Sequence, residues 1–275
     1  MLLGQKISPR VARMRTLPEH VDQRSACRHP DWTGPDDLAI KIQELRELTD
    51  WEKPIYVKIG ATRVFHDVKL SVHAGADVVV VDGMQGGTAA TQLAFIEHVG
   101  IPTLAAIREA VDALEEMNMK NKVQLIVSGG IRSGADVAKA LALGADAVAI
   151  GQGMLIALGC NSDTYSHNGA HLSAAEDYHR LGTAPGYCHH CHTGKCPVGV
   201  TTQDPDLELR LDPEAGAKHV RNYLKTMTME LTLLARACGK KDVHHLERED
   251  LVALSIEAAA MARVPLAGTL WIPGT

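Results

Sequence analysis

The sequence has little of what nucleic-acid or membrane binding requires. Aromatic residues make up 4% of the 275 residues, and the net charge at pH 7 is −5. Without a basic excess or a series of stacking aromatics we expect no nucleic-acid partner. No apolar run approaches the roughly 20 residues of a membrane span, and the first residues lack the apolar core and cleavage site of a signal peptide. These absences favour a cytoplasmic protein that works away from membranes.

Cysteine is also scarce, but its placement is informative. Of six cysteines, three lie close together at Cys188, Cys191 and Cys196. In a reducing compartment such thiols act as metal ligands or stay buried rather than form disulfides. A CxxC pair followed five residues later by Cys-Pro places three thiolates on one loop, which is typical of an iron–sulfur site, and Cys160 is a candidate fourth ligand.

Two other interpretations of this cysteine cluster remain. Zinc accepts mixed sites, and three histidines interleave with the cysteines, at His189, His190 and His192. The second alternative is a set of free cytosolic thiols with no metal.

The hydrophobic residues, 45% of the chain, alternate between strand-like and helix-like runs. Five apolar runs are predicted as buried parallel strands, at residues 55–59, 77–81, 103–105, 123–127 and 147–150. Helical patterns separate them, so the predicted class is α/β. A closed barrel needs eight strands, and five leave two unpaired edges. The predicted architecture is therefore an open doubly wound sheet or a partial (β/α)8 TIM barrel.

The last two predicted strands both end at glycines. Ser128, Gly129 and Gly130 follow the strand at 123–127, and Gly151 and Gln152 follow the strand at 147–150. Glycine lets an anion approach the backbone, and the helix that follows favours negative charge at its N-terminus. In a (β/α)8 barrel this is the usual phosphate position. Ordinary glycine turns are the alternative interpretation.

Two further features fall at the same predicted edge of the sheet. Lys58 lies near the end of the first strand, where a fully buried ammonium would be costly. At a barrel strand's C-terminal end it can instead face a flavin or a carboxylate substrate, although a surface lysine is the simpler alternative. The loop after residue 81 carries a second amide-rich turn, made of Gln85, Gly86, Gly87 and Thr88.

Four consecutive segments are expected from these patterns. Residues 1–35 form an irregular lead-in, and residues 36–160 form the partial barrel. Residues 161–210 hold a polar insertion, with a short helix near 174–181, and the cysteine-rich loop. Residues 211–275 form a helical C-terminal appendage.

Several stretches together resemble the FMN-binding, glutamate-forming domain of the glutamate synthase family. They are VKIGA around Lys58, DGMQGGTAATQ at 82–92, VSGGIRSGADVAKALALGADAVAIG at 127–151, ALGC at 157–160 and CHTGKCPVGVTTQDP at 191–205. Within the family, the chain is most similar to stand-alone large subunits, including those of N-methylglutamate synthase (methylamine–glutamate N-methyltransferase).

The resemblance implies a (β/α)8 barrel with FMN and a 3Fe–4S cluster, reducing the imine of 2-oxoglutarate to glutamate with electrons that reach the flavin through the cluster. It implies that Lys58 contacts the flavin or the 2-oxoglutarate carboxylate and that residues 85–88 line the substrate pocket. It also implies that residues 128–130 and 151–152 hold the FMN phosphate. The methylamine-using relatives form N-methylglutamate. Implied partners are an electron donor and glutaminase-type subunits.

The chain departs from the family pattern in two ways. Cys160 matches the family's first cluster cysteine but lies far from Cys188 in sequence. The ligand set is therefore Cys160, Cys191 and Cys196, or Cys188, Cys191 and Cys196, or all four around a 4Fe–4S cluster. The five predicted strands correspond to barrel strands 4 to 8. We therefore expect a fragment or half of a split enzyme completed by another chain, and the rival is an inactive assembly subunit with a metal staple.

Overall fold

The computed structural model describes residues 1–24, 26, 29–87, 91–167 and 169–274. The chain divides into two compact units. The first, here called the cysteine unit, combines Met1–Ser25, Gly87–Glu97 and Gln152–Lys225. The second, the sheet unit, combines Ala26–Gly86, His98–Gly151 and Thr226–Thr275. Each unit joins stretches that are distant in sequence, and the four consecutive segments expected above stay a prediction.

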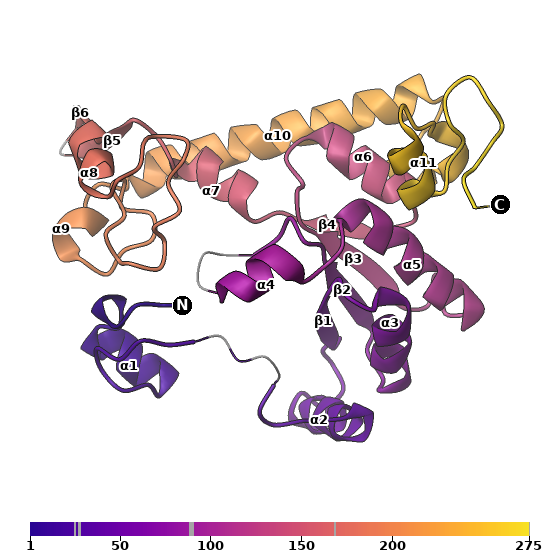
Figure 1. Ribbon diagram of the computed structural model, residues 1–275, viewed down its shortest axis with the longest axis horizontal. Helices are drawn as coiled ribbons and strands as arrows, with labels where there is room; N and C mark the ends of the chain where they lie inside the picture. Colours follow the sequence, from indigo (N-terminus) through magenta and orange to yellow (C-terminus); the bar gives the residue numbers. More distant parts are fainter. Residues whose placement is uncertain (25, 27–28, 88–90, 168, 275) are drawn as a thin grey trace. The chain divides into compact units, whose positions relative to one another are not determined.

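The sheet unit is built on four parallel strands, β1 (Tyr56–Gly60), β2 (Val78–Asp82), β3 (Gln124–Ser128) and β4 (Ala147–Ala149), in that order across the sheet (Figure 1). The pairing register aligns the ends of the first three strands, because Gly60 lies opposite Asp82 and Asp82 lies opposite Ser128. Polar residues that end neighbouring strands are therefore brought to one edge of the sheet.

Helices bury one face of this sheet. They include α2 (Pro35–Leu48), α3 (Val64–His73), α5 (Thr103–Glu116), α6 (Gly134–Ala142) and α11 (Ile256–Ala262), of which α3 and α5 pack on each other and on the strands. Side chains that alternate along the strands form the core, at Val57, Val79, Val81, Leu125 and Val127. The intervening positions are most open on β1, where both Tyr56 and Lys58 are exposed, whereas Val78 of β2 is also buried. This period of two is that of a sheet with one covered face.

The prediction of a fifth strand at residues 103–105 is wrong. Thr103 is the first residue of α5, and the extended backbone is confined to the residues before it. Ile101 donates its N–H to Ala61 O at 2.8 Å and accepts from Met84 N at 2.9 Å. The run fails as a strand because its apolar residues continue at helical spacing, and Ala106, Ile107 and Ala110 are buried on one helix face. The α/β class with parallel strands is confirmed, whereas the partial barrel stays a prediction.

The C-terminal part of the sheet unit is helical, as expected, but its details differ. The long helix α10 (Pro213–Ala237) contributes its residues from 226 onward. It lies very close to α6, because a Cβ on Gly134 would stand 2.4 Å from Met227 O. The second expected helix begins later than predicted. Two short 3-10 turns (Val243–His245 and Arg248–Asp250) precede α11.

The cysteine unit has little regular structure and a small core. It contains a 3-10 turn (Gly4–Lys6), α1 (Pro9–Arg15), most of α4 (Leu93–His98), α7 (Gln152–Leu158), the antiparallel hairpin of β5 (Thr164–His167) and β6 (Ala170–Ser173), α8 (Ala175–Arg180), α9 (Pro205–Glu208) and the first half of α10. The expected short helix is confirmed as α8. The hairpin was not predicted, and helix α1 lies within the segment expected to be irregular.

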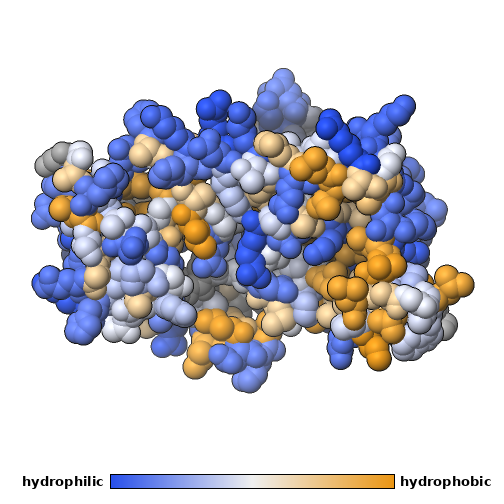
Figure 2. Space-filling view, turned by 90° about the horizontal axis from the view of Figure 1, so that it is seen from above, coloured by the Kyte–Doolittle hydropathy of each residue, from blue (hydrophilic) through white to orange (hydrophobic). Residues whose placement is uncertain are grey.

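Exposed apolar side chains gather on the C-terminal segment of the sheet unit. Figure 2 shows hydrophobic surface concentrated in the right-hand part of the view. The exposed residues in this segment include Val252, Leu254, Ile256, Leu270 and Trp271. Among the described helices, none combines the length and the apolar character needed to cross a membrane.

Candidate cysteine site and strand-end site

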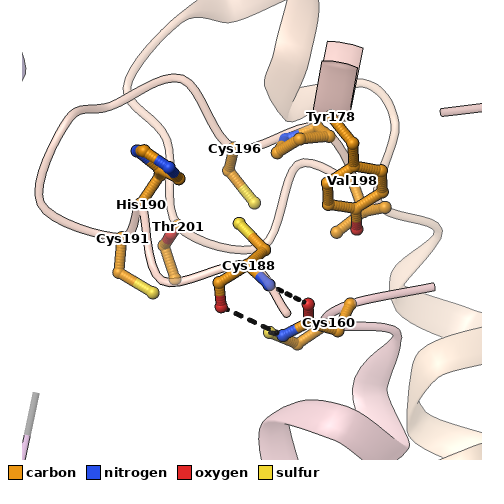
Figure 3. Close-up of a pocket in the computed structure, with 10 residues that line it drawn as sticks. Cys160, Tyr178, Cys188, His190, Cys191, Cys196, Val198 and Thr201 are labelled. Atoms are coloured by element: carbon orange, nitrogen blue, oxygen red, sulfur yellow. Dashed lines mark hydrogen bonds between the residues drawn. The ribbon is translucent and has the colours of Figure 1, made fainter. Parts of the chain in front are cut away.

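Four cysteines from two separate stretches line one pocket of the cysteine unit (Figure 3). Cys160 follows the end of α7, and Cys188, Cys191 and Cys196 come from the loop after α8. Figure 3 shows the sulfurs of Cys188 and Cys196 pointing toward each other. The structure therefore brings together all four cysteines proposed from the sequence, and the described cysteines form no disulfide.

A pair of hydrogen bonds ties Cys160's segment to the loop. The Asn161 side chain accepts from Cys188 N at 2.8 Å and donates to Cys188 O at 3.3 Å. Asn161 has a left-handed φ of 63°, a conformation that asparagine adopts more readily than most residues. The residue next to Cys160 thus closes the long interval between Cys160 and Cys188.

Two large side chains support the other side of the pocket. Tyr178 of α8 is 1% exposed and donates its hydroxyl to Ser162 O at 2.9 Å. The Arg210 guanidinium donates to Asp177 Oδ2 at 2.6 Å and to Pro197 O at 2.7 Å. These contacts fix the backbone directly after Cys196 to α8.

Burial raises the pKa of two thiols of the pocket, and the neighbouring thiols add to the effect. Burial raises the pKa of Cys160 to about 11, with further contributions from Cys191 and Cys196. Burial also raises the pKa of Cys188, and the buried hydroxyl of Tyr178 has its pKa raised for the same reason, with the thiols adding to the effect. Four thiolates in this pocket would repel one another unless a positive group lay among them. A bound metal would supply that charge and invert the local charge balance.

The four thiols of the pocket are donors that suit an iron–sulfur cluster, and zinc accepts them as well. Thr201 lines the pocket, and its buried Oγ1 has no hydrogen-bond partner among the described residues. This hydroxyl could therefore donate to an acceptor bound in the pocket. A zinc ion draws its ligands to one point at about 2.0–2.3 Å. Within the described ranges, no three or more His, Cys, Asp or Glu side chains are placed to hold a metal ion of any kind.

Two histidines of the loop, His190 and His192, have lowered pKa values, chiefly because they are partly buried. His189 stacks on His190 at 4.6 Å between ring centroids, and burial together with the neighbouring rings lowers the pKa of His190. Among them, only His190 lines the pocket with the cysteines.

A second polar site lies at the strand ends of the sheet unit. Lys58 Nζ is 3.0 Å from Asp82 Oδ2, and Ser128 Oγ donates to Asp82 Oδ1. The three residues come from β1, β2 and β3 and share one sheet face because their register positions differ by zero or two residues. Lys58, which is 59% exposed, therefore presents a held positive charge at this edge.

The neighbouring loop is held by its glutamine. Gln85 Oε1 accepts from Thr103 N at 3.0 Å and from Thr103 Oγ1 at 2.9 Å, so its carbonyl oxygen is committed to the start of α5. A Cβ on Gly86 would stand 2.1 Å from Asp82 Oδ1. Gly87 belongs to the cysteine unit, and Thr88 lies outside the described residues. A substrate-lining role for these four residues stays a prediction.

The two glycine turns behave differently. Gly129 and Gly130 have φ angles of 102° and 79°, and a Cβ on Gly129 would stand 2.8 Å from Thr103 Oγ1. Gly151 has open space around its Cα and follows β4, whose Ala149 pairs with Ser128. The two turns thus leave neighbouring strands at the same edge. Gln152 opens α7 and belongs to the cysteine unit.

Sequence reasoning missed several residues of the cysteine pocket. Asn161 was detectable only as the polar neighbour of Cys160. Tyr178, Arg210 and the N-terminal residues that contact the loop carried no signal in the sequence, because they reach the pocket or its loop only through tertiary contacts. Thr201 lies within the stretch at 191–205 that carries the family resemblance, but nothing in that stretch marked it as a pocket residue.

The fold belongs to a class that includes flavin enzymes. A double mutant of flavocytochrome b2 with pyruvate bound superposes with a TM-score of 0.50 at 21% identity, covering 95% of this chain and 44% of that one. At this identity the likeness concerns the fold alone.

The sequence comparisons are more specific. The family described as "Conserved region in glutamate synthase" matches residues 1–171 and 182–241, so the chain belongs to the glutamate synthase family. A "Glutamate synthase large subunit-like protein" of Rhizobium meliloti is 65% identical over 274 residues, which cover 100% of this chain and 60% of that protein. An "Archaeal glutamate synthase [NADPH]" of Methanocaldococcus jannaschii is 38% identical, over 89% of this chain and 43% of that protein. The chain spans about half the length of these relatives.

Proposed function

We propose that the chain is the flavin- and iron–sulfur-binding part of a glutamate synthase-type oxidoreductase that reduces the imine of 2-oxoglutarate to glutamate. The observation that carries the proposal is the gathering of four cysteines around one pocket with an unpartnered hydroxyl, in a chain of this family. The cluster is proposed as 3Fe–4S or 4Fe–4S, with ligands drawn from Cys160, Cys188, Cys191 and Cys196.

The strand-end site supports the flavin part of the proposal. When bound, FMN would supply the hydride for the imine carbon and an iron–sulfur cluster would supply single electrons. Lys58 would hold an anionic group, either on the flavin or on the keto acid, while Asp82 and Ser128 keep its ammonium in place. The turns at 128–130 and at Gly151 would hold the phosphate by their backbone amides.

Other residues of the strand-end site hold the loop in position rather than contribute a charge. Gln85 is anchored to Thr103, so the loop before Gly86 is preorganised at the strand ends. Gly86 lets the loop pack closely against the strand end, because a Cβ there would stand 2.1 Å from Asp82 Oδ1. The electron donor is proposed to be a separate carrier, since relatives are named for NADPH and for ferredoxin.

The cluster is tested by metal analysis of the chain purified without oxygen. We expect iron and acid-labile sulfide in the native chain and loss of both in Cys191→Ala, whereas Cys238→Ala, at an exposed cysteine of the sheet unit, keeps them. Zinc in place of iron, or the same iron content in both variants, would overturn the cluster assignment. A zinc-bound chain without flavin would instead support the assembly-subunit alternative.

The flavin site is tested with a glycine pair. Gly129→Ala places a methyl group against Thr103 and forces a side chain into a left-handed turn, so we expect loss of bound FMN. Gly60→Ala, where a Cβ meets nothing within 4 Å, should retain it. Equal FMN content in the two variants would contradict the phosphate assignment. Glutamate formation from 2-oxoglutarate with ammonia, compared with N-methylglutamate formation with methylamine, then separates the two amine donors.

A further inference from the structure

The first residues of the chain contact the backbone of the cysteine loop at three consecutive carbonyls. Lys6 Nζ donates to Cys191 O, Leu3 N donates to His192 O at 3.1 Å, and Gln5 Nε2 donates to Thr193 O at 2.8 Å. These three carbonyls belong to consecutive residues at the start of the stretch that joins two candidate cluster ligands, Cys191 and Cys196. We call residues 3–6 the N-terminal strap.

The strap is itself firmly held within the cysteine unit. Gly4 donates its N–H to Asp22 Oδ1 at 2.6 Å, and a Cβ at Gly4 would stand 2.2 Å from His20 O. Leu2 pairs with Gln23 as an isolated antiparallel bridge, and Ile7, directly after the strap, is 0% exposed. The strap is therefore a firmly held part of the cysteine unit, and its hydrogen bonds to the loop belong to the fold of that unit.

Lys6 brings a positive charge to the cysteines. It forms none of the ion pairs with carboxylates that occur among the described residues. Burial lowers the pKa of Lys6, while Cys191 and Cys196 act in the opposite direction and favour its charged form. Lys6 also faces His192 of the loop, and the pKa of His192 is lowered, chiefly by burial. A half-buried charge is screened less by salt than an exposed one, so it acts on its surroundings at longer range.

We propose that the N-terminal strap positions the cysteine loop and that the Lys6 ammonium raises the reduction potential of the cluster held by that loop. The inference rests on the proposed iron–sulfur function. Adding an electron makes a cluster more negative, and a nearby fixed positive charge stabilises the reduced form. Lys6 is a positioning and tuning residue, since its contact is with the Cys191 carbonyl and not with a sulfur.

The test is a redox titration of the cluster, followed by its visible absorption and electron paramagnetic resonance, in the native chain and in three variants. For Lys6→Gln we expect the reduction equilibrium constant to fall about tenfold, a potential lower by about 59 mV for one electron. Lys6→Arg keeps the charge and should keep the potential. Lys195→Gln removes an exposed lysine of the same loop and should shift the potential much less, because solvent screens that charge.

The outcomes separate this inference from the function on which it rests. A native chain without iron or sulfide would refute the proposed function. A native cluster with the same potential in Lys6→Gln, or with equal shifts in Lys6→Gln and Lys195→Gln, would refute the inference alone. If Lys6→Gln binds no cluster, Lys6→Arg decides: a normally loaded cluster at the native potential supports the role of the charge, and failure to load overturns it.

Discussion

Replacing Arg210 with alanine should loosen the cysteine unit and leave the sheet unit unaffected. The Arg210 side chain is 17% exposed, bonds to Asp177 and to Pro197 O, and lies 4.4 Å over the ring of Tyr165. Each hydrogen bond to a charged group contributes about 1.5–3 kcal/mol, and a cation over an aromatic ring adds about 0.5–1 kcal/mol. Asp177 is 29% exposed and recovers water, so the loss of its bond costs little, and the Pro197 bond and the ring contact together leave a net loss of about 2 kcal/mol.

The chain contains a matched control for this variant. Arg180 also faces Asp177, at 3.9 Å, and pairs with Glu176 one helical turn away, but its side chain is 67% exposed. Exposed pairs of this kind contribute about 0.3–0.5 kcal/mol. Arg180→Ala therefore removes the same charge beside the same carboxylate at a much smaller cost in stability.

Hydrogen exchange read peptide by peptide measures the difference. In Arg210→Ala, amides of α8 and of residues 194–199 should exchange about 30-fold faster, which corresponds to about 2 kcal/mol of lost local stability. Arg180→Ala should change them less than threefold. Peptides of β1, β2 and β3 report on the sheet unit and should not change. Equal acceleration in both variants, or acceleration spread over the strands, would refute the reasoning that Arg210 clamps the loop after Cys196.

Two further predictions concern the same unit. Gly199→Ala should lower the thermal midpoint far more than Gly182→Ala. Both glycines have left-handed φ angles, of 78° and 69°, which cost an alanine about 1–2 kcal/mol. Of the two, only Gly199 would place its Cβ against backbone, 2.5 Å from Leu207 O. Similar melting curves for the two variants would contradict the close approach of residues 199 and 207. In the iron-free chain, stability should fall as the pH rises from about 9 to about 11, because burial raises the pKa of Cys160 to about 11 and the unfolded chain releases that proton first. Urea unfolding across this pH range should show the loss, and Cys160→Ala should reduce it; an unchanged slope in that variant would assign the effect to other groups.

Much of the sheet unit could be predicted from the sequence. The strands β1 and β2 follow from short β-branched runs that end in glycine or aspartate, where backbone and side-chain preferences agree. The strands β3 and β4 follow from apolar residues that lead within two positions to a glycine. The error at residues 103–105 arose because an apolar start of a buried helix is locally indistinguishable from a buried strand. Only the hydrogen bonds of Ile101 to Ala61 and Met84 show where extended backbone ends and α5 begins.

The cysteine site likewise has one part that follows from the sequence and another that follows only from tertiary contacts. By itself, the sequence determined only that three thiols share one short loop, because the spacing of Cys188, Cys191 and Cys196 confines them there whatever the rest of the chain does. Tertiary structure decided what surrounds them. Asn161 ties Cys160 to the loop, Thr201 turns a buried hydroxyl toward the pocket, and Lys6 reaches the Cys191 carbonyl from the other end of the chain. Such contacts join residues far apart in sequence, and no local pattern records them, because they depend on how the chain folds back on itself rather than on the preferences of neighbouring residues.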